Sequence, residues 1–291
     1  MVVASRQERA LLEACLASLL PQCSAHQAEL IVARAGTVVA LEAAYPSVTF
    51  VEAPAGVALP ALRAAGMAVA DGDVVALTED HCVVAPDWLG QMLAAQAAGA
   101  DVVGGVMENS RRDRAIDWAA YFAEYGTYIS EAPAGDLQQV TAANVAYGRS
   151  VVGDVIAAAR EGHWEKVAHD RLFARGRTVA FLATAAVYQN RSHRFADFCR
   201  DRFAHGRDYA MERLAEEGTG RRWFYLIGAP LLPFLLTGRI ARAAGRRQLG
   251  PFVRALPYTF LFLAAWSAGE AAGYLRGPRL ARDGPDRTGR A

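Results

Sequence analysis

The chain has 291 residues, of which 53% are hydrophobic and 21% charged. This length suffices for one large core or for one domain with an appendage, and the composition excludes a globally disordered chain. The four cysteines, at positions 15, 23, 82 and 199, form no CxxC pair. They argue against a zinc ribbon or a disulfide framework and fit a reducing compartment. The opening MVVAS lacks the charged and apolar regions of a secretory signal.

The net charge of +1 conceals an asymmetry between the two parts of the chain. Residues 1–188 carry 13 Lys and Arg against 21 Asp and Glu, a formal charge of −8, whereas residues 189–291 carry 18 against 9, a charge of +9. The basic part also holds the longest apolar runs. Anionic membrane lipids are therefore a more natural partner than nucleic acid, for which no motif is present.

Short β-type runs alternate with longer helical runs through the first half. The patterns predict strands at 2–4, 30–33, 48–51, 74–77 and 101–106, and helices at 8–20, 59–70 and 86–98. Such alternation is typical of a mostly parallel α/β sheet with helices on both faces. Ligands of these sheets bind beyond the carboxyl ends of the strands.

The basic part has a different pattern. Residues 194–217 predict an amphipathic, Arg-rich helix, and two apolar stretches follow at 223–238 and 255–275. The first contains Pro230 and Pro233, and the second contains Glu270. Residues 281–291 are expected to form a disordered tail.

Glu79, Asp80 and His81 follow a predicted apolar strand. Two carboxylates and an imidazole at that place are costly unless solvent or a cation compensates them. Carboxylate oxygens with one imidazole suit Mg²⁺ or Mn²⁺, and Mn²⁺ tolerates the nitrogen better. A divalent ion there would neutralise charge on a departing diphosphate. The alternative is a solvated strand end with a coincidental cluster of charges.

The stretch ADGDVVALTEDHCVVAPDWL, residues 70–89, resembles the metal-site segment of family 2 glycosyltransferases with the GT-A fold. In that family A-x-G-D leads into a strand, a D-x-D motif and then P-x-W-L, so Glu79, Asp80 and His81 stand at D-x-D. The outer positions depart from the usual aspartates. Some relatives use D-x-H, which keeps His81 as a candidate ligand.

Other segments resemble the same family in the same order over about residues 1–190: ERALLEACLASLLPQ (8–22), ALRAAGMAVADGD (61–73), AANVAYGRS (142–150) and WEKVAHDRLFARGRTVAFL (164–182). The resemblance implies that Arg63 and Asp73 lie on the donor side. It implies that Asn144 and Arg149 lie on the acceptor side.

The pair His169-Asp170 matches the family's E-D pair, with His169 in place of the usual Glu. The resemblance makes Asp170 the general base, which takes a proton from the acceptor hydroxyl in an inverting displacement. It also places His169 on the acceptor side. The alternative is that Asp170 serves only as a helix N-cap.

Two segments depart from the family pattern. After the second strand, Arg34 and Ala35 stand where acids are expected to recognise the base, and only Gly36 and Thr37 fit the donor-side pattern. An arginine offers donors where a uracil N–H needs an acceptor, so the base is held differently or is not uracil.

Further along, Gln189 stands where relatives often have a His near the diphosphate. His193 and Arg194 follow closely. An Arg and His cluster suits a diphosphate or a phospholipid headgroup equally well.

Trp118, Tyr121, Phe122 and Tyr125 have the spacing of one helical face. Core packing is one interpretation of this stripe. The other is an acceptor-binding wall that includes Trp118.

The apolar stretches admit three interpretations. A straight span needs roughly 20 residues, and a two-span hairpin would carry the Arg-rich connector 239–254 across the membrane, against the positive-inside tendency. Re-entrant or in-plane helices with arginines on lipid headgroups are favoured. The hairpin and a soluble packing against the first domain or a dimer partner are the alternatives.

We therefore predict a GT-A-like, Rossmann-like catalytic domain at 1–188, an Arg-rich linker at 189–218, membrane-associated apolar helices at 219–280 and a tail at 281–291. The predicted function is transfer of a sugar from a nucleotide-diphosphate-sugar to a lipid-linked or membrane-proximal acceptor, with Mn²⁺ or Mg²⁺, on the cytoplasmic side of the plasma (inner) membrane. A catalytically silent, membrane-bound relative is the alternative. A nucleotidyltransferase is disfavoured because MVVASRQER has no phosphate-loop glycine. The sequence leaves the oligomeric state open.

Overall fold

The computed structural model describes residues 1–126, 128–129 and 140–278. The chain divides into two compact units. The sheet unit comprises residues 1–110 and 128–191. The helical unit comprises residues 111–127 and 192–291. The predicted tail at 281–291 lies outside the described residues.

The sheet unit is built on an eight-stranded sheet in the order β3-β2-β1-β4-β7-β6-β8-β5. The parallel pairs are β1 with β2 and β4, β2 with β3, and β6 with β8, whereas β7 is antiparallel to β4 and β6, and β5 to β8. The strands are β1 (Val2–Ser5), β2 (Ile31–Ala35), β3 (Thr49–Ala53), β4 (Val74–Glu79), β5 (Cys82–Val84), β6 (Val102–Asn109), β7 (Val145–Gly148) and β8 (Val179–Gln189). The predicted mostly parallel α/β sheet is confirmed.

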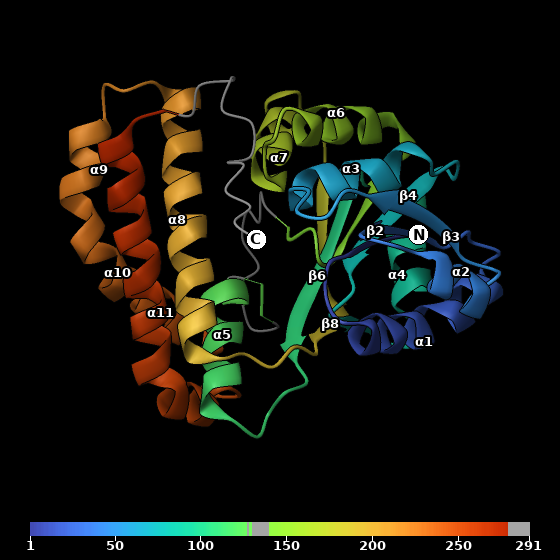
Figure 1. Cartoon of the computed structure of the whole chain (residues 1–291), viewed down its shortest axis with the longest axis horizontal. Coiled ribbons are helices and arrows are strands. Elements are labelled where there is room, and N and C mark those ends of the chain that lie inside the picture. Colours follow the sequence, from blue (N-terminus) through green and yellow to red (C-terminus); the bar gives the residue numbers. More distant parts are fainter. Residues whose placement is uncertain (127, 130–139, 279–291) are drawn as a thin grey trace. The chain divides into compact units, whose positions relative to one another are not determined.

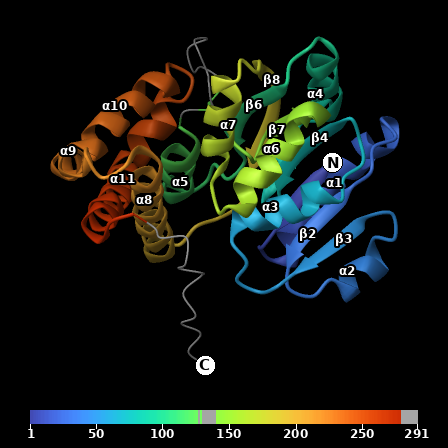
Figure 2. The same cartoon turned by 90° about the horizontal axis from the view of Figure 1, so that it is seen from above.

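Helices cover both faces of this sheet, with α3, α6 and α7 on one face and α1 and α4 on the other (Figures 1 and 2). Their bounds are α1 (Arg9–Ala25), α2 (Val39–Ala44), α3 (Leu59–Ala68), α4 (Trp88–Ala97), α6 (Arg149–Arg160) and α7 (Glu165–Ala174). Because both faces are covered, the central strands are apolar throughout, as the buried run Val2–Ala4 shows.

The main apolar core lies between the sheet and the helices α3, α6 and α7. It includes Ile31 and Val75 from the strands, Met67 from α3, and Val151 and Leu172 from α6 and α7. Gly66 permits this packing, because a Cβ on it would lie 2.6 Å from a methyl carbon of Val2. This packing fixes the positions of the strands, and therefore also the positions of the residues at their carboxyl ends.

The helical unit contains α5 (Ala115–Tyr125), α8 (Phe195–Glu217), α9 (Arg222–Gly228), the short 3-10 helix η1 (Ala229–Leu231), α10 (Leu232–Ala244) and α11 (Leu249–Arg276). The unit thus includes residues 111–127, which the sequence analysis assigned to the first domain. This insertion between β6 and β7 has no signal in local periodicity. Pro230 lies in η1 and Pro233 in the first turn of α10, where proline is favoured because the first turn needs no N–H donor.

Small residues let α8 and α11 approach each other closely. A Cβ on Gly206 would collide with the carbonyl oxygen of Trp266, and one on Gly269 would collide with that of Phe203. Such contacts between glycines and a neighbouring backbone are typical of helix pairs that pack in lipid. The α8–α11 pair is therefore the centre of the helical unit.

Two segments of this unit are long and apolar enough to cross a membrane, Arg222–Ala244 and Leu249–Arg276. Only 17% and 28% of their most apolar windows are buried. The core helix of a soluble protein would be mostly buried, so these values leave a large apolar surface that is not covered by the described residues.

The close α8–α11 approach predicts a specific stability defect. We expect Gly206→Ala to lower the free energy of unfolding by about 1–3 kcal/mol, because the added methyl group forces the helices apart. Thermal unfolding in detergent measures the effect. The control is Gly238→Ala on α10, where a Cβ meets nothing within 4 Å and where the exchange gains up to about 1 kcal/mol of helix propensity. Equal melting temperatures for the two variants would contradict the packing.

Candidate functional site

The carboxyl ends of the parallel strands form the candidate site. Strands β1, β2 and β4 end at Ser5, Ala35 and Glu79 at the same edge of the sheet. Cys82, at the start of the antiparallel strand β5, pairs with Gln189 at the end of β8. This edge is where open α/β sheets bind their ligands.

Asp80 organises the loop after β1. Its side chain is 2% exposed, and its Oδ2 accepts hydrogen bonds from Ser5 Oγ at 2.9 Å and from the backbone N–H groups of Arg6 at 2.7 Å and Gln7 at 2.6 Å. These three hydrogen bonds tie the loop after β1 to the turn after β4. Arg34 joins the same loop, because its Nη1 donates to Ser5 Oγ at 2.6 Å.

Arg63 links three elements at this edge. Its buried guanidinium on α3 pairs with Glu79 of β4 and, at 2.8 Å, with Glu165 at the start of α7. Burial lowers the pKa of Arg63, but Glu165 and Glu79 outweigh it and raise that pKa. Burial likewise raises the pKa of Glu165, and the opposing attraction of Arg63 brings it below its usual value. Arg63 is therefore charged, and it favours the ionised form of Glu165.

His81 completes the turn after β4. Its Nδ1 lies 3.5 Å from Glu79 Oε2 and 3.9 Å from Asp80 Oδ1. Burial lowers the pKa of His81, but interactions with its neighbours, including a hydrogen bond with Asp80, outweigh it and raise that pKa. The backbone oxygen of His81 accepts a hydrogen bond from the N–H of Asn190 at 2.8 Å. Gln189 thus lies beside the triplet, as its family position implies.

The donor chemistry of the triplet fits a divalent cation. Glu79, Asp80 and Glu165 bring three carboxylates to one edge, where Arg63, His81 and Arg34 are the cationic groups described. One oxygen each of Glu79 and Asp80 faces the imidazole, and oxygen with one nitrogen is a set that Mn²⁺ accepts. Within residues 1–126, 128–129 and 140–278, however, no three His, Cys, Asp or Glu side chains converge as a metal centre.

His169 and Tyr147 form a buried pair behind Glu165. His169 is 1% exposed, and its Nε2 lies 2.9 Å from Tyr147 Oη. Its Nδ1 has no hydrogen-bond partner among the described residues. Burial lowers the pKa of His169 to about 4, so the ring is neutral at pH 7. His169 therefore lies on the buried face of α7, in the core, and not on an open acceptor surface.

Asp170 lies on the outer part of α7. Its side chain is 46% exposed and pairs with Lys166 one turn earlier. It is a helix-interior residue, since α7 runs from Glu165 to Ala174, so the N-cap alternative is wrong. The cap position belongs to Trp164.

Asp73 and Arg149 lie at the other end of β4. Asp73 precedes the strand, about 20 Å from Glu79 at the strand rise of about 3.3 Å per residue. Its carbonyl oxygen accepts a hydrogen bond from the N–H of Arg149, whose side chain donates to the carbonyl oxygens of Ala70 and Gly72. The predicted donor and acceptor roles of Asp73 and Arg149 are therefore corrected, since these residues brace the amino end of the strand.

Asn144 is fully buried and braces the sheet. Its Oδ1 accepts from Trp88 Nε1 at 2.7 Å, and its Nδ2 donates to the carbonyl oxygens of Val106 and Ala185 at 2.9 Å. These bonds occupy the amide, so the predicted contact with an acceptor is corrected to a structural role. Gly36 and Thr37 follow β2 at the site edge, with Gly36 in the left-handed region at φ 102°.

Trp118, His193 and Arg194 belong to the helical unit. Trp118 is 6% exposed and stacks on Phe122 at 5.6 Å, so the aromatic stripe is core packing. His193 is 4% exposed, with its ring 4.6 Å from that of Phe198. The burial of Trp118 corrects its predicted role in an acceptor-binding wall. Arg194 is exposed at the start of α8, where it could contact a headgroup or a diphosphate.

Glu165 is the site residue that the sequence analysis missed. Its signal is the sequence Gly162-His163-Trp164-Glu165, in which a left-handed glycine and an extended Trp164 start a helix with an acid in its first turn. Trp164 adds a cation–π contact, with Arg63 5.6 Å from its ring centre.

The mostly parallel sheet with an acidic turn at its carboxyl edge defines a GT-A glycosyltransferase. The sequence model of the family "Glycosyl transferase family 2" matches residues 1–156, more than half of the chain. The chain belongs to glycosyl transferase family 2. It is a glycosyltransferase, and the resemblance found in the motifs is confirmed.

A solved glycosyltransferase structure shares this fold, and a second shows a weaker similarity. The mannosyltransferase PcManGT from Pyrobaculum calidifontis, in complex with GDP-Man and Mn²⁺, has a TM-score of 0.54 and 15% identity, over 92% of this chain and 86% of that one. Glucosyl-3-phosphoglycerate synthase from Mycobacterium tuberculosis, in complex with phosphoglyceric acid, has a TM-score of 0.42 and 14% identity, over 67% and 73%. No curated protein matches the sequence significantly.

The buried His169 predicts a pH-dependent loss of stability. Its pKa is about 4 in the folded state against 6.5 as the ordinary value. Between these values the unfolded chain binds more protons, so acid favours unfolding. We expect the wild type to lose up to about 3 kcal/mol more than His169→Gln as the pH falls from 6.5 to 4. Urea unfolding of both proteins across that range measures it, and parallel pH profiles would contradict the assignment.

Proposed function

We propose that this glycosyltransferase is an inverting enzyme that moves a sugar from a nucleotide-diphosphate-sugar to a lipid-linked or other membrane-proximal acceptor. The observation that carries the proposal is the turn Glu79-Asp80-His81, held at the carboxyl edge of β4 by Arg63 and by the loop after β1. A donor diphosphate is an anion, and its binding among these carboxylates requires a counter-cation. Glu79, Asp80 and His81 would hold a divalent ion, which when bound neutralises charge on the departing diphosphate.

The nucleotide base of the sugar donor is proposed to present hydrogen-bond acceptors to the protein. Arg34 stands at the family's base-recognition position and points its Nη1 to Ser5 Oγ and the carbonyl oxygen of Gln7. A guanidinium complements the O6 and N7 acceptors of guanine, whereas a uracil N–H requires an acceptor. PcManGT was solved with GDP-Man, which is consistent with a guanosine donor. Tighter binding of UDP than of GDP would contradict this assignment.

The general base is proposed to be one of two carboxylates on α7. Asp170 is the residue that the family motif indicates. Glu165 lies in the ion-pair cluster with Arg63 and Glu79. On a helix, residues five apart are about 140° apart around the axis, at about 100° per residue, so the two carboxylates cannot point in one direction. Only one of them can accept the proton of the acceptor hydroxyl.

A pair of isosteric variants decides between these two carboxylates. We expect Asp170→Asn to lower kcat by at least about a hundredfold, the usual contribution of general base catalysis, with the donor Kd nearly unchanged. Glu165→Gln should chiefly weaken donor binding, because it disturbs Arg63. The measurements are turnover with membrane lipid extract and calorimetric donor binding. Unchanged turnover in Asp170→Asn would remove Asp170 as the base, and a kcat loss confined to Glu165→Gln would assign the role to Glu165.

The helical unit is proposed to lie against the cytoplasmic face of the plasma membrane. Along α9, η1 and α10, large apolar side chains are 60–75% exposed with helical spacing on one face: Trp223, Phe224, Ile227, Leu231, Phe234 and Leu235. Arg246 and Arg247 lie exposed between α10 and α11. An apolar face edged by arginines is the composition of an interfacial helix pair on anionic lipid. This placement would keep the sheet unit in the cytosol, where nucleotide-sugars are available.

Cysteine labelling tests the side of the α10–α11 connector. Cys15, Cys23 and Cys82 are buried, and Cys199→Ser provides a background without a partly exposed thiol. In this background we expect Arg246→Cys and the sheet-unit reporter Thr37→Cys to react with a membrane-impermeant maleimide in the same inverted membrane vesicles. Labelling of Arg246→Cys only in right-side-out vesicles would show a two-span hairpin and overturn the in-plane proposal.

A further inference from the structure

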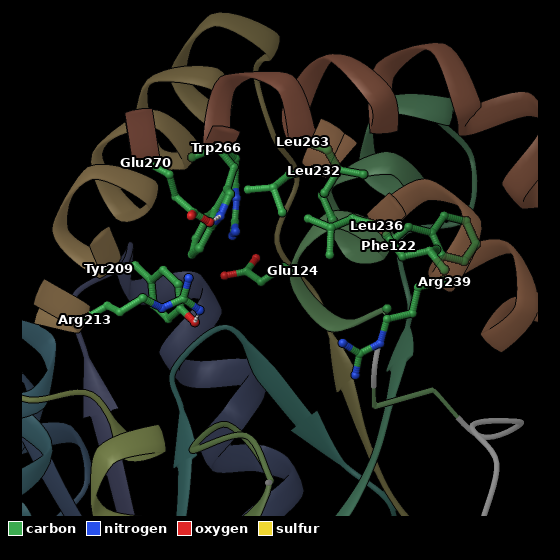
Figure 3. Close-up of a pocket in the computed structure, with 14 residues that line it drawn as sticks. Phe122, Glu124, Tyr209, Arg213, Leu232, Leu236, Arg239, Leu263, Trp266 and Glu270 are labelled. Carbon is green, nitrogen blue, oxygen red and sulfur yellow. Dashed lines mark hydrogen bonds between the residues drawn. The ribbon is translucent and has the colours of Figure 1, made fainter. Parts of the chain in front are cut away.

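A cavity of about 350 Å³ lies within the helical unit (Figure 3). Residues of α5, α8, α10 and α11 line it. Its lining is divided by chemistry. Leu232, Leu236 and Leu263 form an apolar part, whereas three arginines and two glutamates from four helices line the rest: Arg202, Arg213, Arg239, Glu124 and Glu270.

Arg202 on α8 is the buried charge of this cavity. It is 8% exposed, and its guanidinium carbon lies 4.4 Å from the ring centre of Trp266. Its Nε has no hydrogen-bond partner among the described residues. Burial lowers the pKa of Arg202, and Glu124 only partly opposes that effect. An unsatisfied buried N–H is costly, so the Nε of Arg202 is a donor to which a ligand could supply an acceptor.

Arg213, also on α8, lines the same cavity and is held by hydrogen bonds. It donates to Tyr274 Oη at 3.0 Å and to Tyr209 Oη at 2.5 Å. Glu270 is satisfied by other groups, since it accepts from Trp266 Nε1 and, at 3.0 Å, from Tyr274 Oη. Tyrosine and tryptophan donors therefore satisfy two acceptor positions of Glu270. Three arginines against two glutamates leave the lining with a formal charge of +1.

A second cavity of about 460 Å³ adjoins the first and shares Arg213, Leu232 and Glu270 with it. The rest of its lining is almost entirely apolar, with Phe224, Ile227, Leu231 and Leu235 among its residues. Phe224 and Ile227 are also 68% and 75% exposed. A cationic compartment thus continues into an apolar one that opens on the proposed membrane face.

We propose that the two cavities together bind one anionic lipid. Its phosphate contacts Arg202 and Arg239, and its hydrocarbon chain occupies the apolar cavity beside Phe224 and Leu235. Arginine is the side chain best suited to phosphate oxygens, because its planar fork donates two parallel hydrogen bonds. The site rests on the proposed membrane association only in that lipid must reach it, and it requires no glycosyl transfer.

Native mass spectrometry of the full chain in an uncharged maltoside detergent tests this site. The probes are a long-chain polyisoprenyl monophosphate, the matching uncharged polyisoprenol, phosphatidate and inorganic phosphate. We expect one phosphate-bearing lipid per chain, and at least tenfold weaker binding of the alcohol and of inorganic phosphate. Equal binding of the alcohol would overturn the cationic half of the site. Binding of inorganic phosphate as tight as that of lipid would overturn the apolar half.

Variants separate the site from general surface charge. Arg202→Gln should weaken binding of the lipid phosphate at least tenfold, and Arg254→Gln, an exposed arginine on α11 outside both cavities, should leave it unchanged. Equal losses in both variants would overturn the site. Should Arg202→Gln fail to fold by thermal melting, Arg239→Gln at its exposed position takes its place, with the same expected loss. Lipid binding that persists in a chain without donor binding would count against the proposed function and leave this site standing, whereas donor binding without lipid binding would overturn the site alone.

Discussion

The buried carboxylate of Asp80 is the interaction on which the catalytic edge depends. It accepts three hydrogen bonds from the loop after β1, and hydrogen bonds to a charged group contribute about 1.5–3 kcal/mol each. Without the carboxylate, two backbone N–H groups at the sheet edge would lose their partner. Asp80 therefore fixes the conformation of the loop after β1 and of the turn after β4 together.

Arg63 extends this arrangement across the sheet. It joins α3, β4 and α7 by pairing with Glu79 and Glu165, and Trp164 covers its other face. Because the pairs are largely buried, removal of one partner would leave an uncompensated charge, which is more costly than the pair is stabilising. The site is thus pre-organised by its charges, with Glu79 and Glu165 both paired to one buried guanidinium.

The sequence predicted the sheet and the edge of the site because those follow from local patterns. Apolar runs such as Val74–Leu77 predict central strands, and the acids after them mark the carboxyl edge. The insertion of α5 into the helical unit could not be predicted, because its aromatic stripe has the same period whether it faces a core or a ligand. Asp73 and Arg149 matched family positions, yet their place at the amino end of β4 depends on tertiary register. Glu165 was missed because its partner Arg63 is 102 residues away in sequence.

Three structural features are combined in the helical unit. Glycines let α8 and α11 pack closely, exposed apolar rings and leucines follow α9 and α10, and a buried arginine lacks an acceptor. In water an exposed apolar face and an unsatisfied buried N–H are both unfavourable. Next to anionic lipid, as proposed for this unit, the apolar face would be buried and the arginine would gain phosphate oxygens, so one environment accounts for both.

Calorimetric titration of the full chain with GDP and with UDP, each with Mn²⁺ and with chelator in its place, tests the central claim most directly. We predict that GDP binds to the chain in the presence of Mn²⁺, and that it binds more tightly than UDP. Chelation of the metal should weaken GDP binding at least tenfold. Failure of both nucleotides to bind, or binding that is equally tight without the metal, would contradict the claim that the Glu79-Asp80-His81 turn holds a metal and a donor diphosphate.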